Sequence, residues 1–539
     1  MKSKRHKPKK SIVTAPQTET LLCIGVDTAT LPVYTLPKSP WLPRVLLAFA
    51  LLSGIGLMVP VVSAGALALD EHGTYWLVGP ENPGTLWQRS LDYENIPPLS
   101  PLLQRQLCYL FGTNELSLRS LSILSYLLAI AAVYLLAREL MDPIGASLAA
   151  NILAWHPRVL GEVRIARCYG LTLLLATLAF WATLRWSRKL DSWWLVPWVL
   201  LNSALLWTHY LNAPLVVAQV AWLIWSCRHS SPPSLIALLA GSACVMISAI
   251  PLFEPIVRIA TWSASFSFQA EQPILRVIGP HWWLGLPAGC LVGQFWMARV
   301  PAERLAVPKA SMVTLLLAWG LLPTVFAAIG CQGDLSSLAN PRYRMGFYGP
   351  SACLLAALLC YRRSALAAVL SVAVALSLGW LLAPRLPWDL KRIGHQRDEE
   401  WRVMAQTVEQ HGQDGEPVFV QSGLGEGFIV PIYFDDMLFQ DYAACRMGRF
   451  YLKSDHPRFA LPYLWDRSDK MVAFYEDLLR SFSQSDCSSL WIASATDTDL
   501  NRRSWADFEV LVRKWGYEEV RRHESANAVL IQYNRQSDP

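Results

Sequence analysis

The stretch "VLLAFALLSGIGLMVPVVSAGALAL" at residues 45–69 decides the fold, because it is a long apolar run without a charged side chain. A helix needs about 20 apolar residues to cross the ~30 Å hydrocarbon core of a bilayer. "DEHGTYW" (70–76) follows directly, so the adjacent carboxylates of Asp70 and Glu71 close the run. We predict a membrane-spanning helix with two acids at its exit. A solvated loop would also account for the pair, and Glu71 could simply be an acid at a helix start.

The first apolar run is expected to be retained in the protein. "ALA" at 66–68 has the small-x-small pattern of a cleavage site, but the apolar part of a signal peptide is shorter and begins nearer the N-terminus. The basic "MKSKRHKPKK" (1–10) leads into a Pro/Thr-rich stretch without a hydrophobic period. We therefore predict a disordered cytoplasmic tail over residues 1–42.

The composition is that of a membrane protein. Hydrophobic residues make up 53% and charged residues 16% of the chain, whereas soluble domains carry about 25% charged residues. The 24 Trp and 18 Tyr suit a protein with many membrane–water boundaries. The net charge is only +6 and no basic stripe is visible, which argues against a nucleic-acid partner.

Further runs of spanning character predict a polytopic α-helical membrane domain over residues 43–384, with about eleven helices in all. These runs lie at residues 120–137, 143–157, 170–185, 193–208, 213–226, 234–252, 282–298, 310–330, 346–361 and 364–383. With the basic tail inside, the short basic turns between the spans also fall inside, as the positive-inside rule expects. The outer face then receives 69–118, 156–169, 251–281, 331–345 and the region after 384.

Residues 385–539 are predicted to form a soluble α/β domain on the outer face. Two amphipathic stretches predict helices, 398–412 and 503–516, and three apolar stretches predict strands, 417–423, 489–494 and 527–533. Cys445 and Cys487 lie in this region and could pair with each other. "SGLGEG" (422–427) lacks the full dinucleotide-binding pattern and is interpreted as a turn.

Ionisable side chains collect on the predicted outer face, while the helices are almost free of charge. Arg164, Arg167 and Arg342 are informative there, because positive charge on the outer side runs against the topology rule. The planar guanidinium suits phosphate oxygens, and the Asp70 carboxylate could accept a proton. The combination indicates a lipid-phosphate substrate. The arginines could instead bind lipid headgroups without chemistry. Arg164 and Arg167 could also snorkel to the membrane surface or pair with Glu162.

Several motifs, in this order, resemble the protein-mannosyltransferase and aminoarabinose-transferase family of GT-C glycosyltransferases. They are "LDEHGTYW" (69–76), "IPPLSPLL" (96–103), "FGTNELSLRSLSIL" (111–124), "HPRVLGEVRIARCYGLTLL" (156–174), "THY" (208–210), "PRY" (341–343) and "EEWRVMAQTVEQ" (399–410). The resemblance covers most of residues 45–430. Cys168 is a departure, because relatives commonly have Pro before the tyrosine that is Tyr169 here.

The resemblance implies transfer of a sugar, with inversion, from a polyprenyl-phosphate donor to a hydroxyl of a glycan, glycolipid or protein, without a metal. It implies that Asp70 is the catalytic base and Glu71 its helper. The implied substrate-binding residues are Glu162, Arg164, Arg167, Tyr169, His209, Arg342 and Tyr343. We expect a multi-pass protein of the plasma (inner) membrane, and the placement of Lys and Arg predicts a cytoplasmic N-terminus and an extracytoplasmic C-terminal domain.

Two other functions are compatible with a polytopic chain. A lipid or solute transporter, such as a flippase, would show paired halves or charged, broken helices at mid-membrane, and neither an internal repeat nor much mid-span charge is found. A non-catalytic scaffold would tolerate replacement of Asp70 and Arg167. His209 could likewise be a structural histidine at a membrane boundary.

Overall fold

The computed structural model describes residues 41–62, 65–189, 192–227, 232–263, 310–330, 341–360, 365–381, 399–465, 469–485, 487–496 and 499–536. Every described residue lies within one compact unit, Ser39–Pro539. The predicted tail up to residue 40 and the predicted span at 282–298 lie outside the described residues. The predicted domain boundary at residue 384 also lies outside them and stays a prediction.

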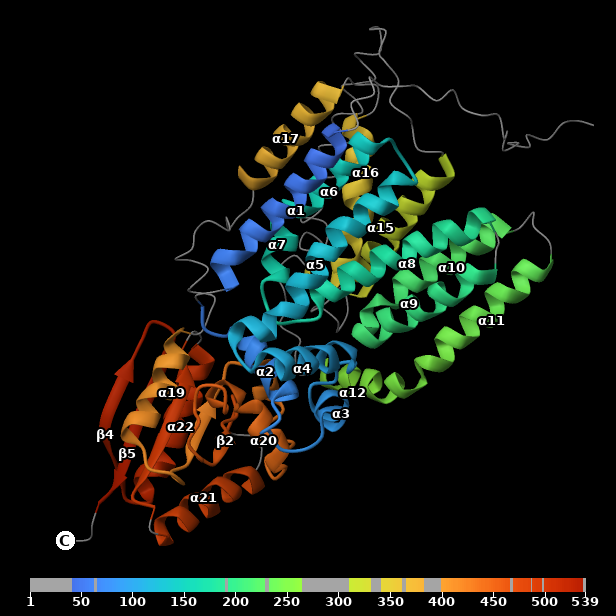
Figure 1. The fold of residues 1–539 in the computed structure, drawn as a ribbon. Coiled ribbons are helices and arrows are strands. Elements are labelled where there is room, and N and C mark those ends of the chain that lie inside the picture. Colours follow the sequence, from blue (N-terminus) through green and yellow to red (C-terminus); the bar gives the residue numbers. More distant parts are fainter. Residues whose placement is uncertain are drawn as a thin grey trace, which may run out of the picture. The chain divides into compact units, whose positions relative to one another are not determined.

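The described residues before 382 are mostly helical (Figure 1). Its longer elements are α1 (Trp41–Val62), α2 (Leu69–Val78), α4 (Leu99–Phe111), α5 (Glu115–Arg138), α6 (Pro143–Ala154), α7 (Pro157–Val163), α8 (Tyr169–Lys189), α9 (Leu195–Thr208), α10 (Ala213–Cys227), α11 (Pro232–Ser248), α12 (Phe253–Ser263), α15 (Ala310–Gly330), α16 (Tyr348–Cys360) and α17 (Ala365–Leu381). Short turns connect them: α3 (Leu86–Gln88), η1 (Arg89–Tyr93), η2 (Ser192–Trp194), η3 (Tyr210–Asn212), η4 (Ile250–Leu252) and η7 (Pro341–Phe347). Each predicted apolar run that the structure describes falls on a helix.

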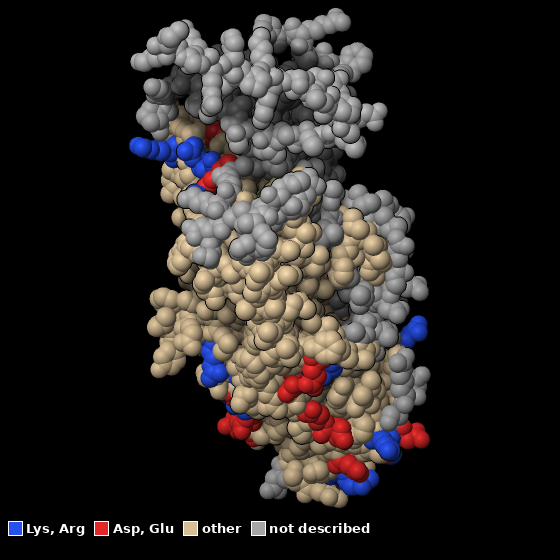
Figure 2. Space-filling view, turned by 90° about the vertical axis from the view of Figure 1, so that its right-hand side faces the viewer, with Lys and Arg blue, Asp and Glu red and all other residues tan. Residues whose placement is uncertain are grey.

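The predicted number of spans, about eleven, is not confirmed. Two described helices are long and apolar enough to cross a membrane, Trp41–Val59 and Glu115–Arg138. A third span results if Leu235–Ser248 and Ile250–Ile259, which are bent by 41° at their junction, count as one. Among the described residues, four shorter apolar helical stretches have 10–17 residues, fewer than the roughly 20 that a perpendicular crossing requires: Pro143–Ala154, Leu195–Thr208, Tyr210–Trp225 and Ala365–Leu378. On the face drawn in Figure 2, the middle is almost free of charged residues, which gather mostly towards one end.

The described residues from 399 onward, which we name the C-terminal α/β region, contain a five-stranded sheet of order β2-β1-β3-β5-β4. The elements are α19 (Glu399–His411), β1 (Val418–Gln421), η8 (Gly425–Phe428), α20 (Met437–Ala443), η9 (Cys445–Met447), β2 (Arg458–Ala460), α21 (Asp469–Gln484), β3 (Ser489–Ala495), α22 (Asp499–Lys514), β4 (Tyr517–Glu524) and β5 (Ala528–Arg535). Strand β1 is parallel to β2 and β3, whereas β5 is antiparallel to β3 and β4.

Alternating side chains of the strands enter two hydrophobic cores, one on each face of the sheet. Phe419 points into the core that α21 and α22 cover, whereas Val418 and Val420 point into the core of α19 and α20. The second core also contains Tyr75 and Trp76 of α2. The short helix that follows the first apolar run therefore packs on the sheet of the C-terminal α/β region.

The predicted helices and strands of this region are present, and other elements were missed. The strand β4 reads "YEEVRRHE" and exposes most of its side chains, as an edge strand can. It therefore shows no alternation of polar and apolar residues. The possible disulfide between Cys445 and Cys487 is absent, since both cysteines are free.

Candidate active site

Helix α2 places Asp70 in its first turn. The chain enters the helix at Ala68, whose backbone N–H donates to Oε2 of Glu71 and whose carbonyl oxygen accepts from the backbone N–H of Glu71, both at 2.8 Å. A carboxylate in the first turn is favoured by the partial positive charge of the helix N-terminus. The helix start that was the alternative for Glu71 is observed, and Asp70 lies in the same first turn.

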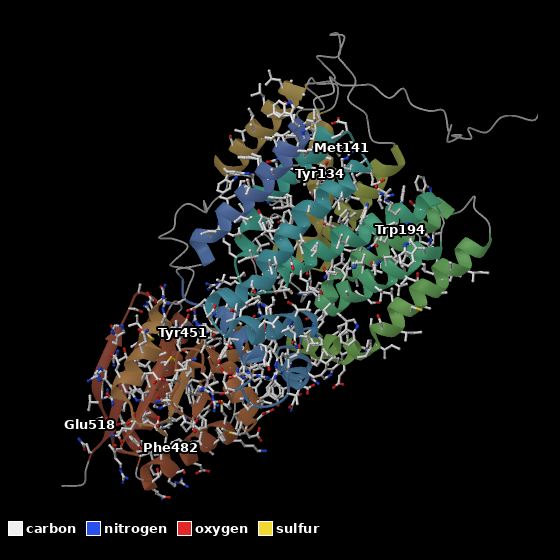
Figure 3. All side chains as sticks on the ribbon, in the orientation of Figure 1. Tyr134, Met141, Trp194, Tyr451, Phe482 and Glu518 are labelled. Atoms are coloured by element: carbon white, nitrogen blue, oxygen red, sulfur yellow. The ribbon has the colours of Figure 1, made fainter. Side chains whose placement is uncertain are left out.

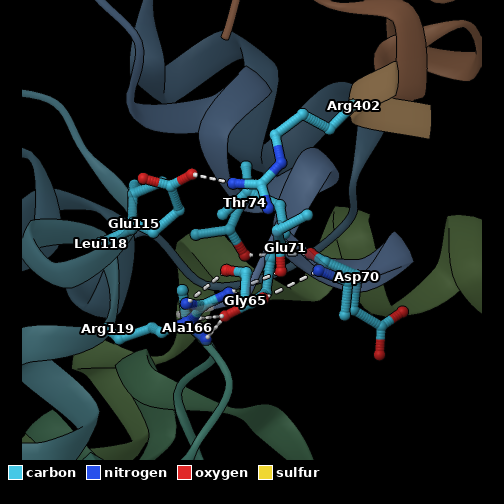
Figure 4. Close-up of polar contacts among 12 residues, drawn as sticks. Gly65, Asp70, Glu71, Thr74, Glu115, Leu118, Arg119, Ala166 and Arg402 are labelled. Atoms are coloured by element: carbon cyan, nitrogen blue, oxygen red, sulfur yellow. Dashed lines mark hydrogen bonds and ion pairs between the residues drawn. The ribbon is translucent and has the colours of Figure 1, made fainter. Parts of the chain in front are cut away.

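The carboxylate of Glu71 is completely buried and is surrounded by hydrogen-bond donors (Figure 4). Arg119 of α5 donates from Nε to Oε1 and from Nη2 to Oε2, and Ala166 donates its backbone N–H to Oε1, each at 2.7 Å. Arg119 also donates to the carbonyl oxygens of Gly65 and Ala66, at 3.0 and 2.9 Å. With its oxygens occupied in this way, Glu71 anchors the chain around α2. Its predicted part in catalysis stays a prediction.

Replacing Glu71 with Gln is expected to destabilise the protein strongly. The buried guanidinium of Arg119 would lose its counter-charge, and breaking a buried pair costs about 3–5 kcal/mol. The measurement is thermal unfolding of the purified full chain in detergent, with Glu81→Gln as the control, because Glu81 is exposed. An unfolding midpoint equal to that of the wild type would contradict an anchoring role for Glu71.

Asp70 points away from the Glu71–Arg119 pair (Figure 4). Its carboxylate lies between two other arginines, Arg342 and Arg167. Nη1 of Arg342 donates to Oδ2 of Asp70 at 2.5 Å, and Nη2 of Arg167 lies 3.8 Å from Oδ1. Burial alone would raise the pKa of Asp70, but Arg167 and Arg342 outweigh it and hold this pKa below its ordinary value. The side chain remains 25% exposed, so an ionised carboxylate at neutral pH is open to an incoming group.

Arg167 joins Asp70 to a second acid, Glu94. The guanidinium forms a close ion pair with the largely buried carboxylate of Glu94, and Nη1 lies 3.4 Å from the hydroxyl oxygen of Thr74. Gly73 of α2 allows the Glu94 carboxylate to lie close to the helix, because a Cβ at residue 73 would be only 3.1 Å from Oε2 of Glu94. Neither Glu94 nor Thr74 was among the predicted site residues, and no spacing in the sequence indicates their contact with Arg167.

The rings of Tyr343 and His209 lie near Arg342. Nη2 of Arg342 donates to the hydroxyl of Tyr343 at 3.3 Å, and the Arg342 guanidinium lies 5.2 Å from the centre of the Tyr343 ring. The ring of His209 meets that of Tyr343 edge-on, with 5.5 Å between their centres. Nδ1 of His209 accepts from the backbone N–H of Leu211, and burial together with Arg167 and Arg342 lowers its pKa to about 4. His209 is therefore neutral at physiological pH.

The segment around α7 supplies the remaining predicted residues. His156 caps α7 through its ring nitrogen, which accepts from the backbone N–H of Arg158 at 3.2 Å. Glu162 lies near Asp70 and Arg342, and burial raises its pKa to about 7. Arg164, at the C-terminal end of α7, and Tyr169, the first residue of α8, are buried.

The C-terminal α/β region contributes a further acid, Glu426, which the sequence analysis missed. It lies on η8, within the "SGLGEG" segment, whose interpretation as a turn agrees with this short helix. Burial raises the pKa of Glu426, with Glu94 adding to the rise, while Arg167 and a 2.9 Å hydrogen bond from the Tyr442 hydroxyl oppose it. The acids around Arg167 thus come both from the N-terminal helical part of the chain and from the C-terminal α/β region.

Metal ligands are not apparent in the part of the chain that the structure describes, where no group of three or more His, Cys, Asp and Glu side chains could hold a metal ion. The expectation that the protein needs no metal stays a prediction.

Comparison with known proteins bears on the predicted resemblance. Residues 95–253 match the family described as dolichyl-phosphate-mannose-protein mannosyltransferase. The fold is similar to that of ArnT from Cupriavidus metallidurans bound to undecaprenyl phosphate, with a TM-score of 0.57, 14% identity and coverage of 92% of this chain and 98% of that chain. The predicted resemblance to GT-C glycosyltransferases is confirmed. The apo structure of the same ArnT gives a TM-score of 0.56 at the same identity and coverage. Curated protein sequences give no match.

Proposed function

We propose that this chain is a membrane glycosyltransferase that moves a sugar from a polyprenyl-phosphate donor to a hydroxyl group, with inversion, on the outer face of the plasma (inner) membrane. The acceptor is a glycan, a glycolipid or a protein. The GT-C fold supports a glycosyltransferase, and the ArnT of similar fold is bound to undecaprenyl phosphate. The observation that carries the proposal is the ionised Asp70 between Arg342 and Arg167.

In the proposed reaction, the acceptor oxygen attacks the anomeric carbon from the side opposite the phosphate. The bond between the anomeric carbon and the phosphate oxygen breaks, and its electron pair leaves with the polyprenyl phosphate. The acceptor proton passes to Asp70. Arg342 and Arg167 stabilise the charge that grows on the departing phosphate, as positioned cations do in transition states. Each bond broken is thus matched by one formed.

Donor binding is expected to prepare Asp70 for this step. In the described structure, the guanidinium groups of Arg342 and Arg167 are directed at Asp70 and hold its pKa low, which makes it a weak base. A donor phosphate would take up part of their hydrogen-bonding capacity, because arginine binds phosphate readily. The Asp70 pKa then rises, and the carboxylate becomes a better proton acceptor once the donor is in place.

The pH dependence distinguishes Asp70 from Glu162 as the base. A base must be deprotonated, so activity falls as the pH drops through its pKa. The pKa of Asp70 in the free enzyme lies below its ordinary value, whereas that of Glu162 is about 7. We expect kcat/KM to stay level from about pH 8 to about pH 5. A fall below pH 7 that Glu162→Gln abolishes would assign the base to Glu162 instead.

The experiment that tests the proposed function uses the full chain in vesicles and a panel of polyprenyl phosphates carrying labelled hexoses or pentoses. A cell-envelope extract serves as acceptor. Transfer of label to the extract, with release of polyprenyl phosphate, supports the proposal. Movement of the intact donor across the bilayer without an acceptor would favour a transporter.

A further inference from the structure

Helix α2 belongs to the hydrophobic core of the C-terminal α/β region rather than to a core of its own. Leu67, Tyr75 and Trp76 lie in the same buried cluster as Met404 of α19 and Val420 of β1. Tyr75 packs edge-on against an aromatic ring of that region, that of Phe450, with 4.9 Å between the ring centres. The helix that carries Asp70 is thus built into the sheet that lies more than 300 residues further along the chain.

The N-terminal end of α2 is held by Tyr451. The Tyr451 hydroxyl accepts from the backbone N–H of Leu67 at 2.9 Å and donates to Oε1 of Glu115 at 3.0 Å. Arg402 of α19 lies 3.7 Å from the same Glu115 oxygen. The Tyr451 ring also meets the ring of His72 edge-on at 5.8 Å. Figure 3 shows Tyr451 at the border between the C-terminal α/β region and the first helices.

The C-terminal end of α2 is held by Asp441 of α20. Nε1 of Trp76 donates to Oδ2 of Asp441 at 2.8 Å. Arg458 of β2 donates from Nε and Nη2 to Oδ1, at 2.9 and 2.6 Å, so the acceptor is itself fixed to the sheet. A ten-residue helix is about 15 Å long, and α2 is therefore fixed at both ends of that length.

We propose that the C-terminal α/β region positions the helix that bears Asp70, with Tyr451 and Asp441 as the two positioning residues. The inference rests on the proposed function, because it concerns the placement of the proposed base. Leu67 lies three residues before Asp70, so the Tyr451 hydroxyl controls the entry of the chain into the first turn. A displacement of about 1 Å at a reacting group can lower a rate by about 100-fold.

The test compares Tyr451→Phe with Tyr475→Phe in the full chain. The first change removes only the hydroxyl that holds Leu67. The second removes a buried hydroxyl that bonds the Ala460 carbonyl and lies in the core on the opposite face of the sheet. We expect Tyr451→Phe to lower kcat about tenfold or more without changing the amount of undecaprenyl phosphate bound per protein. Tyr475→Phe should leave kcat unchanged.

Hydrogen–deuterium exchange gives a second readout that does not depend on activity. We expect faster exchange of the backbone amides of residues 67–72 in Tyr451→Phe and in Trp76→Phe, which removes the donor to Asp441, and no change in Tyr475→Phe. Wild-type kcat together with wild-type exchange in both Tyr451→Phe and Trp76→Phe would overturn the inference. A wild-type chain that transfers no sugar would instead overturn the proposed function, and the exchange data would still test the positioning of α2.

Discussion

Replacing Asp70 with Asn is expected to lower kcat by about 100- to 10,000-fold, the contribution of a positioned general base. The amide is close in size to the carboxylate but cannot take the acceptor proton. It also removes the negative charge that lies 2.5 Å from Arg342 and 3.8 Å from Arg167. The two guanidinium groups then become more available to an anionic donor. Donor affinity should therefore hold or rise while turnover is lost.

Asp92→Asn is the matched control for this variant. Asp92 lies in the same segment of the chain, its side chain is half exposed, and its partner is Arg258 at 3.5 Å. We expect wild-type turnover and a wild-type unfolding temperature from this control. Asp70→Asn should unfold somewhat below the wild type, because the lowered pKa of Asp70 means that its charge stabilises the fold. Turnover is therefore compared at a temperature at which both variants are folded. Turnover of Asp70→Asn within a few fold of the wild type would remove Asp70 from the role of base.

Replacing Arg342 with Ala is expected to produce the second largest loss, about 100- to 1,000-fold in kcat, as for removal of one group that stabilises transition-state charge. Arg342 donates hydrogen bonds to Asp70 and to the hydroxyl of Tyr343. The variant therefore loses a cation that stabilises the departing phosphate, and Asp70 loses a hydrogen-bond donor. Without Arg342 the Asp70 pKa should rise towards its ordinary value, because the arginine lowers it. The acidic limb of the kcat/KM profile should therefore move to higher pH.

Arg342→Lys and Arg258→Ala are the informative comparisons. Lysine keeps the charge but not the planar fork, so we expect it to restore only part of the activity. Arg258 bonds Glu254 at 2.8 Å on the partly exposed helix α12, and its removal should leave kcat unchanged. Equal activity of Arg342→Ala and the wild type, measured at saturating donor, would show that Arg342 does not stabilise the departing phosphate.

The helices could be predicted from the sequence because each apolar run carries its own signal. The runs at 310–330 and 364–383 correspond closely to α15 and α17. The predicted number of spans is not confirmed, because an apolar run fixes neither the length nor the continuity of the helix within it. In the run at 143–157, for example, α6 ends at Ala154, and a new helix, α7, begins at Pro157 with His156 as its N-terminal cap.

The candidate site could be predicted only in part. The sequence analysis predicted that Asp70 acts together with arginines of two distant loops, and the structure places Arg167 and Arg342 beside it. The different roles of Asp70, as the proposed base, and of Glu71, as an anchor of the chain, could not be predicted, because they depend on the contact between Glu71 and Arg119 of α5. Glu94, Glu426 and Tyr451 were missed for the same reason: their partners are far away in the chain, and no local pattern marks such contacts.

The most direct measurement is sugar transfer by the purified full chain in vesicles, with the labelled polyprenyl-phosphate panel, an envelope extract as acceptor, and Asp70→Asn measured alongside the wild type. We predict that the wild type moves label to the extract and releases polyprenyl phosphate, while Asp70→Asn binds the donor and leaves it intact. Recovery of every donor intact from the wild type, or equal transfer by both proteins, would contradict the account.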